Sequence, residues 1–329
     1  MARKSEFDII RQYFAPLSEG APGALGLTND AALWRPSSGH DGVVTADCMV
    51  AEVHFFADDP ADSVAEKILA VNLSDLASMG ARPSAYTLAA AWPAEMDEDW
   101  IARFAGGLQR AQSAYGVDLI GGDTVATPGP LTLSLTAFGE VLENQSLSRS
   151  EARPGDNIYV TGTIGDAALG LKVLKGELEI SSGRPEFLID RYRRPQARTS
   201  VGMGLLGVAT SAIDVSDGLA ADLGHIAEQS DVDIQVQVAD IPLSEAARSA
   251  VEADETLLED ILGGGDDYEL AFTAPADRDA EITELASSSG VPITRIGRAL
   301  ALSGTEAKVG FFDGAAQQLA IETTGFRHF

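Results

Sequence analysis

The stretch Ile213-Asp214-Val215-Ser216-Asp217-Gly218-Leu219 combines an apolar strand end, a short polar turn and the start of a helix. Helical spacing of apolar residues follows it, which predicts a helix over residues 217–229. Ser216 or Asp217 is suited to cap that helix. Asp214 is costly to bury unless a cation or a hydrogen-bond donor compensates its charge. The stretch therefore predicts a strand–turn–helix unit whose polar residues either cap the helix or bind a cation.

The same alternation of strand and helix patterns extends from this stretch in both directions. The turn signal Arg153-Pro154-Gly155-Asp156 is the best candidate boundary between domains. We therefore predict two α/β or α+β domains, residues 1–152 and 153–329. Strands are expected at 42–50, 84–92, 117–120, 131–141, 157–161, 212–214, 231–238, 268–273, 294–298 and 308–312. Helices are expected at 62–79, 97–115, 166–175, 196–210, 217–229, 244–253 and 276–289.

Length and composition limit the classes of function. The chain has 329 residues, which suggests about two domains, and 45% of its residues are apolar, so it has enough apolar side chains for packed cores. A net charge of −27 argues against nucleic acid or an anionic membrane as the main partner. No apolar run reaches about 18 residues, and the N-terminus lacks a signal-peptide pattern. Cys48, the one cysteine, excludes a disulfide framework. We expect a cytoplasmic protein.

One subset of the acidic residues differs from the solvated majority, because its members lie in apolar, Gly-rich or Ser-rich surroundings. Clustered carboxylates repel one another strongly at short range, so a fold that gathers them needs cations. Several Mg²⁺ ions together with a polyphosphate meet that need, because Mg²⁺ binds through a few carboxylates plus substrate phosphates. The same arrangement explains how such an acidic protein binds ATP. The subset is Asp30, Asp47, Asp75, Asp123, Asp214, Asp217, Asp266 and Asp267.

Three further patterns have both a functional and a structural interpretation. Gly121-Gly122-Asp123-Thr124 follows an apolar strand, and predicts either a nest of backbone N–H groups for phosphate or a tight turn capped by the aspartate. Asn72 and Asp75 lie three residues apart on one helix face that is otherwise apolar. They are interpreted either as residues of a functional site or as a polar end of the helix. The G-x-G-x-x-G pattern of residues 202–207 follows no strand, and we interpret it as helix packing. No Walker A sequence is present.

Taken in order, these segments resemble the thiamine-monophosphate kinase family, within the superfamily of aminoimidazole ribonucleotide synthase, selenophosphate synthase and a hydrogenase maturation factor. The resemblance covers almost the whole chain. It is carried by Asn29-Asp30-Ala31-Ala32, Glu52-Val53-His54-Phe55, residues 70–81 (AVNLSDLASMGA), Gly121-Gly122-Asp123-Thr124, Arg153-Pro154-Gly155-Asp156, Ile213–Leu219, Asp267-Tyr268-Glu269-Leu270 and the terminal Gly325-Phe326-Arg327-His328-Phe329.

The resemblance implies a two-domain aminoimidazole ribonucleotide synthase-like fold and ATP-dependent phosphorylation of thiamine monophosphate by direct in-line transfer. It also implies a homodimer, with the N-terminal sheets forming a barrel-like interface. Carried over by position, the Mg²⁺ ligands are Asp30, Thr45, Asp47, Asp75, Asp123, Asp214 and Asp217. The ATP contacts are Tyr115, Gly122, Asp123, Arg149 and Ser216. The contacts to thiamine monophosphate are His54, Asp266 and Phe326.

This chain departs from the family pattern at three positions. Asn29 and Ala46 replace an acidic and a hydroxyl residue, which puts the number of metal ions in question, and Asp266 replaces a glutamate. Two alternatives stay open: an aminoimidazole ribonucleotide synthase, and a non-catalytic dimer that binds nucleotide or divalent cations. Cys48 follows Asp47 within a strand, which argues against selenophosphate synthase, and the lack of a C-terminal cysteine argues against the hydrogenase factor.

Overall fold

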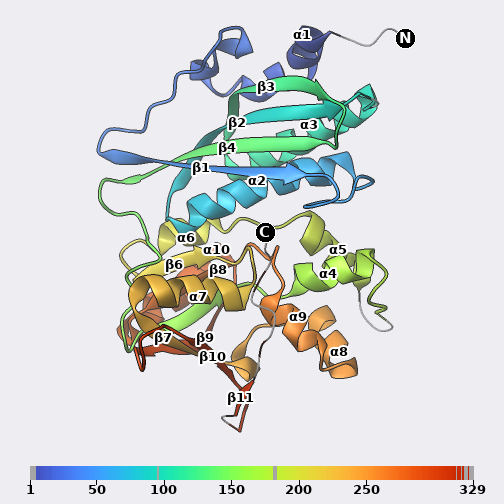
Figure 1. The fold of residues 1–329 in the computed structure, drawn as a ribbon. Helices are drawn as coiled ribbons and strands as arrows, with labels where there is room; N and C mark the ends of the chain where they lie inside the picture. The colour runs from blue at the N-terminus through green and yellow to red at the C-terminus, as the bar shows by residue number, and fades with distance from the viewer. Residues whose placement is uncertain are drawn as a thin grey trace. The chain divides into compact units, whose positions relative to one another are not determined.

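The computed structural model describes residues 5–94, 96–180, 184–315, 317–319, 321 and 325. The chain forms two compact units (Figure 1). Unit 1 comprises Met1–Leu76 and Ala81–Asn144, and unit 2 comprises Ala77–Gly80 and Gln145–Phe329. Among the described residues, no helix has the length and apolar character needed to cross a bilayer.

Unit 1 is built on a sheet that has four strands in the described part of the chain, in the order β1-β4-β2-β3. Strand β4 pairs antiparallel with β1 and β2, whereas β2 and β3 are parallel. A parallel pair needs a crossover connection, and helix α3 supplies it. The elements are β1 (His40–Val50), α2 (Ala61–Ser78), β2 (Arg82–Pro93), α3 (Glu98–Tyr115), β3 (Asp118–Thr127) and β4 (Thr132–Leu142).

Side chains on one face of this sheet meet helices α2 and α3. In β1, Thr45 and Asp47 hydrogen-bond to α2, and in β2 the buried hydroxyl of Tyr86 donates to Gln112 of α3 at 3.0 Å. The two helices pack closely, because a Cβ on Gly107 would lie 2.5 Å from the Asp62 carbonyl oxygen. Before β1 the chain forms α1 (Glu6–Ile9), the π-helical η1 (Ile10–Phe14), and the 3₁₀ turns η2 (Ala15–Ser18) and η3 (Pro22–Leu27).

Helix α3 confirms the predicted helix over residues 97–115 to within one residue. Asp97 caps the helix by accepting the Trp100 N–H at 2.6 Å, and Gly116 ends it in the left-handed conformation. Helix α2 matches the predicted helix over residues 62–79 to within one residue, and Ser63 lies inside it, with its hydroxyl donating to the Pro60 carbonyl. The helix begins two residues earlier than Ser63, directly after the proline.

Unit 2 contains a sheet that, among the described residues, has seven strands in the order β11-β10-β7-β9-β5-β8-β6. Its core is formed by alternating strand residues such as Ile158, Val160 and Ile213. The strands are β5 (Asn157–Thr161), β6 (Ser211–Asp214), β7 (Val232–Gln237), β8 (Leu270–Ala274), β9 (Ile293–Ala301), β10 (Val309–Phe312) and β11 (Gln318–Leu319). The helices are α4 (Asp166–Leu174), α5 (Pro185–Arg193), α6 (Thr199–Gly204), α7 (Leu219–Ser230), α8 (Glu245–Ala253), α9 (Leu257–Gly263) and α10 (Asp279–Ser289), with 3₁₀ turns η4 (Val238–Asp240) and η5 (Ala276–Arg278).

Two helices of unit 2 were not expected, and one is shorter than expected. Helices α5 and α9 lie outside the predicted helix ranges, and Leu257, Ile261 and Leu262 of α9 are buried. The predicted helix over 196–210 is reduced to α6. Its Gly204 confirms the packing interpretation of the glycine pattern, since a Cβ there would lie 2.3 Å from Leu285.

Candidate functional site

The first group of predicted site residues joins strand β1 to helix α2 in unit 1. The Thr45 hydroxyl donates to Asp75 Oδ2 at 2.5 Å, and the Asp47 N–H donates to Asn72 Oδ1 at 3.1 Å. Asn72 is fully buried and in turn donates to the Ile68 carbonyl at 2.9 Å. The predicted common face of Asn72 and Asp75 is therefore confirmed, and it points at the strand that carries Thr45 and Asp47.

This arrangement concentrates negative charge. Burial, together with the negative charge of the neighbouring Asp75, raises the pKa of Asp47 to about 6. The hydroxyl and the two carboxylates supply oxygen ligands, which Mg²⁺ prefers. The positive charge of the ion would also compensate the two partly buried negative charges. The residues present therefore fit a magnesium ion.

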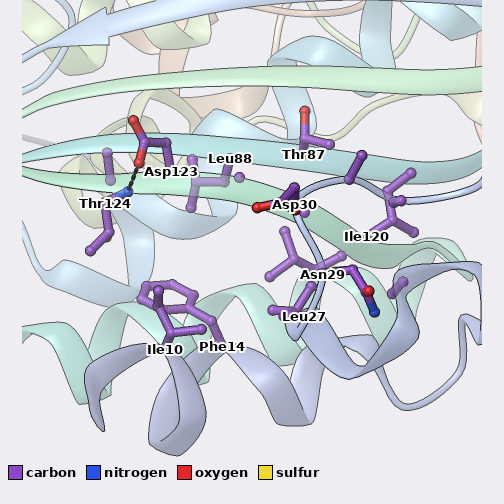
Figure 2. Close-up of a pocket in the computed structure, with 17 residues that line it drawn as sticks. Ile10, Phe14, Leu27, Asn29, Asp30, Thr87, Leu88, Ile120, Asp123 and Thr124 are labelled. Carbon is purple, nitrogen blue, oxygen red and sulfur yellow. Dashed lines mark hydrogen bonds between the residues drawn. The ribbon is translucent and has the colours of Figure 1, made fainter. Parts of the chain in front are cut away.

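The second group lines a cavity of about 360 Å³ between the N-terminal segment and strands β2 and β3 (Figure 2). Asp30 and Asp123 lie on the strand side of the cavity, and Ile10 and Phe14 lie opposite them. The cavity thus combines an apolar wall with carboxylates at one side. It is lined by Ile10, Phe14, Ala24, Leu27, Asn29, Asp30, Ala31, Ala32, Thr87, Leu88, Ala90, Leu119, Ile120, Gly121, Gly122, Asp123 and Thr124.

Both interpretations of the Gly121-Gly122-Asp123-Thr124 motif were wrong, because the motif is neither a nest nor a turn. It lies within β3, paired in parallel with β2 after a register shift. A Cβ on Gly122 would lie 1.9 Å from the Leu88 carbonyl oxygen, so the glycine permits the close approach of the two backbones. The exposed Asp123 is thus presented from a strand, and its Oδ1 accepts the Thr124 N–H at 2.8 Å.

His54 lies in the loop between β1 and α2. Its Nδ1 accepts the Val50 N–H at 3.1 Å, so in the neutral ring the proton is on Nε2. The buried Lys67 donates to the His54 carbonyl at 3.1 Å and holds the loop from the helix side. The half-buried imidazole therefore offers Nε2–H as a hydrogen-bond donor.

The third group is the turn of residues 214–218 in unit 2, between β6 and α7. Asp214 is 2% exposed, whereas Ser216 and Asp217 are half-buried. The expected N-cap was wrong: Gly218 occupies the cap position, and no side-chain cap bond is made there. The carboxylate of Asp222 instead accepts the N–H groups of Ser216, Asp217 and Gly218 at 3.0, 3.1 and 3.1 Å.

Sequence reasoning missed Asp222, although its position in the first turn after Ser216-Asp217-Gly218 was a usable signal. Burial and then the charge of Asp217 raise the pKa of Asp222, the three N–H bonds oppose both effects, and the net result is a pKa of about 7. Donor atoms of Asp217, Asp222 and His225 lie within 4.8 Å of one another. Acidic clusters of this kind are common without an ion, so this one is not assigned a metal.

Asp266 adjoins the same turn. Its N–H donates to the Ser216 carbonyl at 2.9 Å, and its Oδ1 accepts the hydroxyl of Tyr268 at 3.1 Å. Asp266 and Tyr268 both have positive φ values, of 71° and 52°. Such values are uncommon for residues with side chains and concentrate at functional sites. Tyr268 was missed as an individual residue because only its motif had been noted.

The structure therefore gathers the predicted residues into groups within each unit. Thr45 lies with Asp47 and Asp75, Asp30 lies with Gly122 and Asp123, and Asp214, Ser216, Asp217 and Asp266 share one turn region. Two predicted ATP contacts do not join these groups. Tyr115 ends α3 outside the described lining of the cavity, and Arg149 is exposed, with its carbonyl accepting the Ser230 hydroxyl at 2.9 Å. Phe326 lies outside the described residues.

Comparison with known proteins places both halves of the chain in one family. Residues 28–141 match the family model "AIR synthase related protein, N-terminal domain", and residues 153–310 match "AIR synthase related protein, C-terminal domain". The predicted two-domain aminoimidazole ribonucleotide synthase-like fold is thereby confirmed. The barrel-like interface between two copies stays a prediction.

Individual relatives narrow the family further. The thiamine-monophosphate kinase of Escherichia coli (strain K12) is 41% identical over 327 residues, which cover 98% of each chain. The solved thiamine-monophosphate kinase of Stenotrophomonas maltophilia is 43% identical, with a TM-score of 0.83 over 93% of this chain and 96% of that one. The solved AaThiL complex with AMPPCP and TMP is 28% identical, with a TM-score of 0.77 over 100% of this chain and 99% of that one. Identity at this level over essentially full length shows that the chain belongs to the thiamine-monophosphate kinase family of AIR synthase related proteins.

Proposed function

We propose that this chain transfers the γ-phosphoryl group of ATP to thiamine monophosphate, giving thiamine diphosphate and ADP. Membership of the family supports the reaction, and the AaThiL complex with AMPPCP and TMP supports both substrates. The observation that carries the proposal within this chain is that Asp47 on β1 and Asp75 on α2 lie near enough for their negative charges to repel, with Thr45 and Asn72 bonding the strand to the helix. Two carboxylates at close quarters, one with a raised pKa, suit a site that handles phosphate through cations.

We propose that several Mg²⁺ ions are held, with their ligands drawn from Asp30, Thr45, Asp47, Asp75, Asp123, Asp214 and Asp217. When bound, the ions would neutralise charge on the phosphate groups. The chain's own contribution is to hold the ligands in place: Asn72 anchors the backbone of Asp47, and Thr45 orients the carboxylate of Asp75. Strand β3 presents Asp123 at the edge of the cavity.

We propose that ATP contacts Tyr115, Gly122, Asp123, Arg149 and Ser216. The cavity beside Gly122 and Asp123 is a suitable place for part of the nucleotide, because its far wall is apolar and its near side is polar. Glycine at position 122 leaves the surface there free of a side chain. Arg149 supplies the positive charge that this acidic chain otherwise offers sparingly.

The acceptor phosphate is already ionised at neutral pH, so the reaction needs no general base and depends on positioning and charge neutralisation. We propose that His54, Asp266 and Phe326 contact thiamine monophosphate. The Nε2–H of His54 is suited to donate to an anionic oxygen. The carboxylate of Asp266 is suited to the cationic thiazolium ring, and Phe326 is suited to stack on it.

We further propose a homodimer, a cytoplasmic location and the domain ranges 1–152 and 153–329. The dimer is supported by the face of β1 that carries Val44, which is 57% exposed, together with the exposed Ala46 and Cys48. Among the described residues β1 is an edge strand, and association protects such an edge and its apolar face. The C-terminal family match, which starts at residue 153, supports the domain ranges.

The test is ADP release with three acceptors under identical ATP and Mg²⁺: thiamine monophosphate, free thiamine and formylglycinamidine ribonucleotide. We expect turnover with thiamine monophosphate, and thiamine diphosphate as the identified product. Free thiamine should not react, because its neutral hydroxyl would need a general base. Turnover with the ribonucleotide alone would identify the chain as an aminoimidazole ribonucleotide synthase. Nucleotide binding without turnover on any acceptor would favour a non-catalytic dimer.

A further inference from the structure

One buried carboxylate organises the turn between β6 and α7. Asp222 is 2% exposed, and its Oδ2 accepts three consecutive backbone N–H groups, those of Ser216, Asp217 and Gly218. Gly218 is the N-cap residue of α7, and Ser216 and Asp217 directly precede it, so the three N–H groups point from the turn toward the first turn of the helix. Three donors that converge on one oxygen constrain the curvature of the turn, because a different backbone path would leave a buried carboxylate without these hydrogen bonds.

The opposite edge of the same turn is bonded as well. The Ser216 carbonyl accepts the Asp266 N–H at 2.9 Å, and the Val215 carbonyl accepts the Tyr268 N–H at 2.8 Å. Glycines allow the two segments to approach: a Cβ on Gly265 would lie 2.1 Å from the Ser216 carbonyl oxygen, and one on Gly218 would lie 2.6 Å from the Gly263 carbonyl oxygen. The backbone of residues 215–218 is therefore held on both sides.

We propose that Asp222 is a positioning residue for nucleotide binding, which holds residues 216–218 in the one conformation that presents the side chains of Ser216 and Asp217 to the metal–nucleotide complex. The proposal rests on the proposed function, in which those two residues bind ATP and Mg²⁺. It has a chemical consequence. Because the N–H groups of the turn are bonded to Asp222, this helix start binds the ligand through side chains rather than through backbone N–H groups.

Asp222 acts behind the site rather than as a metal ligand. Its Oδ2 already accepts three hydrogen bonds and its side chain is closed to solvent, whereas a ligand to an exchangeable ion needs an accessible oxygen. His225 completes the nearby group of donor atoms but is exposed on α7. Replacing His225 therefore distinguishes the two roles: direct metal binding at this group needs the imidazole, and positioning by Asp222 does not.

The experiment compares four variants of the full chain. Asp222→Ala removes the acceptor, and Asp222→Asn keeps one oxygen acceptor of the same shape without the charge. Asp156→Ala is the matched control, because Asp156 is a buried carboxylate of the same unit that accepts the Arg153 N–H at 2.9 Å and the Thr210 hydroxyl at 2.7 Å, away from the turn. His225→Ala tests direct metal binding. Each is measured for Mg²⁺·AMPPCP binding by calorimetry, for amide hydrogen exchange at residues 216–218 and for folding stability.

We expect Asp222→Ala to weaken Mg²⁺·AMPPCP binding by about tenfold or more and to speed exchange at residues 216–218, because the three N–H groups lose their charged acceptor. Asp222→Asn should stay within about threefold of the wild type, since its oxygen can accept the same bonds. Asp156→Ala should lose stability yet bind normally, and His225→Ala should be unchanged.

Normal binding by Asp222→Ala would overturn the proposal, and so would a loss in Asp222→Asn as large as that in Asp222→Ala. A marked loss of binding in His225→Ala would do the same, because it would show a metal site at that group. The readouts are independent of turnover. If the wild type bound nucleotide but phosphorylated no thiamine monophosphate, the proposed function would fail while the role of Asp222 could still be judged.

Discussion

At the scale of single residues, Asp47 and Asp75 place two negative charges close together in a partly buried region, which is unfavourable for folding. Burial and the neighbouring Asp75 both raise the pKa of Asp47, so the ionised form of Asp47 destabilises the folded chain near neutral pH. Functional sites often retain such unfavourable arrangements because the ligand requires them. Removing the charge should therefore separate stability from activity.

Asp47→Asn and Asp123→Asn should each lower turnover of thiamine monophosphate by roughly 100-fold or more. Each variant removes a carboxylate ligand of Mg²⁺, so the ion would be less well placed to neutralise the negative charge of the transition state. Asp47→Asn should also raise the resistance of the metal-free chain to urea, since the repulsion from Asp75 disappears. Steady-state kinetics at saturating Mg²⁺ and urea unfolding are the measurements. Near-normal rates in both variants would refute their assignment.

Tyr268→Phe should raise the KM for thiamine monophosphate several-fold, which corresponds to about 1 kcal/mol of binding free energy, and should leave kcat little changed. The reason is that Asp266 loses the hydroxyl that orients its carboxylate. Tyr159→Phe is the matched control, since it removes another tyrosine–aspartate bond, to Asp279, in the same unit. A change in kcat of the same size as the change in KM would contradict a role confined to substrate binding.

At the scale of elements, some helix ends are set by residues adjacent in the sequence, and others by residues far along the chain. Asp97 and Gly116 lie beside α3 in sequence, so local residues set both of its ends, and the predicted range of 97–115 is correct to within one residue. Helix α4 begins differently: Asp267, about a hundred residues away, accepts the N–H groups of Gly165 at 2.6 Å and Ala167 at 3.2 Å. No local pattern reports a cap from so far along the chain.

The buried Asp267 should give folding a distinctive pH dependence. Burial raises the pKa of Asp267 well above its usual range, an effect opposed by the Gly165 N–H, so the folded chain binds this proton more tightly than the unfolded chain. This contribution to stability is present at pH below about 4 and is lost as the pH rises toward the raised pKa.

Asp267→Asn cannot ionise, although it loses one N–H bond, worth about 1 kcal/mol. It should therefore be less stable than the wild type near pH 4 and gain on it as the pH rises. Urea unfolding of both proteins over a pH series measures the difference. A difference in stability that stays constant, or that widens with pH in favour of the wild type, would disagree with this expectation.

At the scale of the whole molecule, unit 1 leaves part of a sheet uncovered. Exposed side chains alternate along β1 at Val44, Ala46 and Cys48, while Thr45 and Asp47 turn toward α2. Because successive side chains of a strand point to opposite faces, the site residues of β1 lie on one face of the sheet and the exposed residues suited to association lie on the other. Because the chain carries a high negative charge, two copies repel each other, and association is favoured only at a surface with few charges, such as this face of β1.

Sedimentation should show a dimer at micromolar concentration. Val44→Asp should weaken the dimer by at least about tenfold, because an unpaired charge would be buried at the interface. Phe187→Asp is the control: it makes the same kind of change at an apolar residue that is 40% exposed on α5, in unit 2. A fully active monomer would exclude the dimer as a functional requirement.

Turnover should also depend strictly on a divalent cation. Chelation should abolish activity, and added Mg²⁺ or Mn²⁺ should restore it, because the aspartates of the site have no Walker lysine to replace the cation. The folded state should survive chelation, which circular dichroism can verify. Full turnover in excess chelator would rule out a mechanism that uses metal-bound phosphate.

The sequence by itself determined the alternation of strands and helices, the ends of α3, the shared face of Asn72 and Asp75, and the family. These follow from local propensity, periodicity and ordered motifs, which a single chain displays in full. Only the tertiary structure decided that Gly122 lies within a strand, that Asp222 holds the turn before α7 and that Asp267 binds the N–H groups at the start of α4. It also decided that Thr45 meets Asp75. Each of these depends on backbone or carboxylate groups that find partners across a packed interior, where burial and distance, rather than neighbouring residues, set the energy.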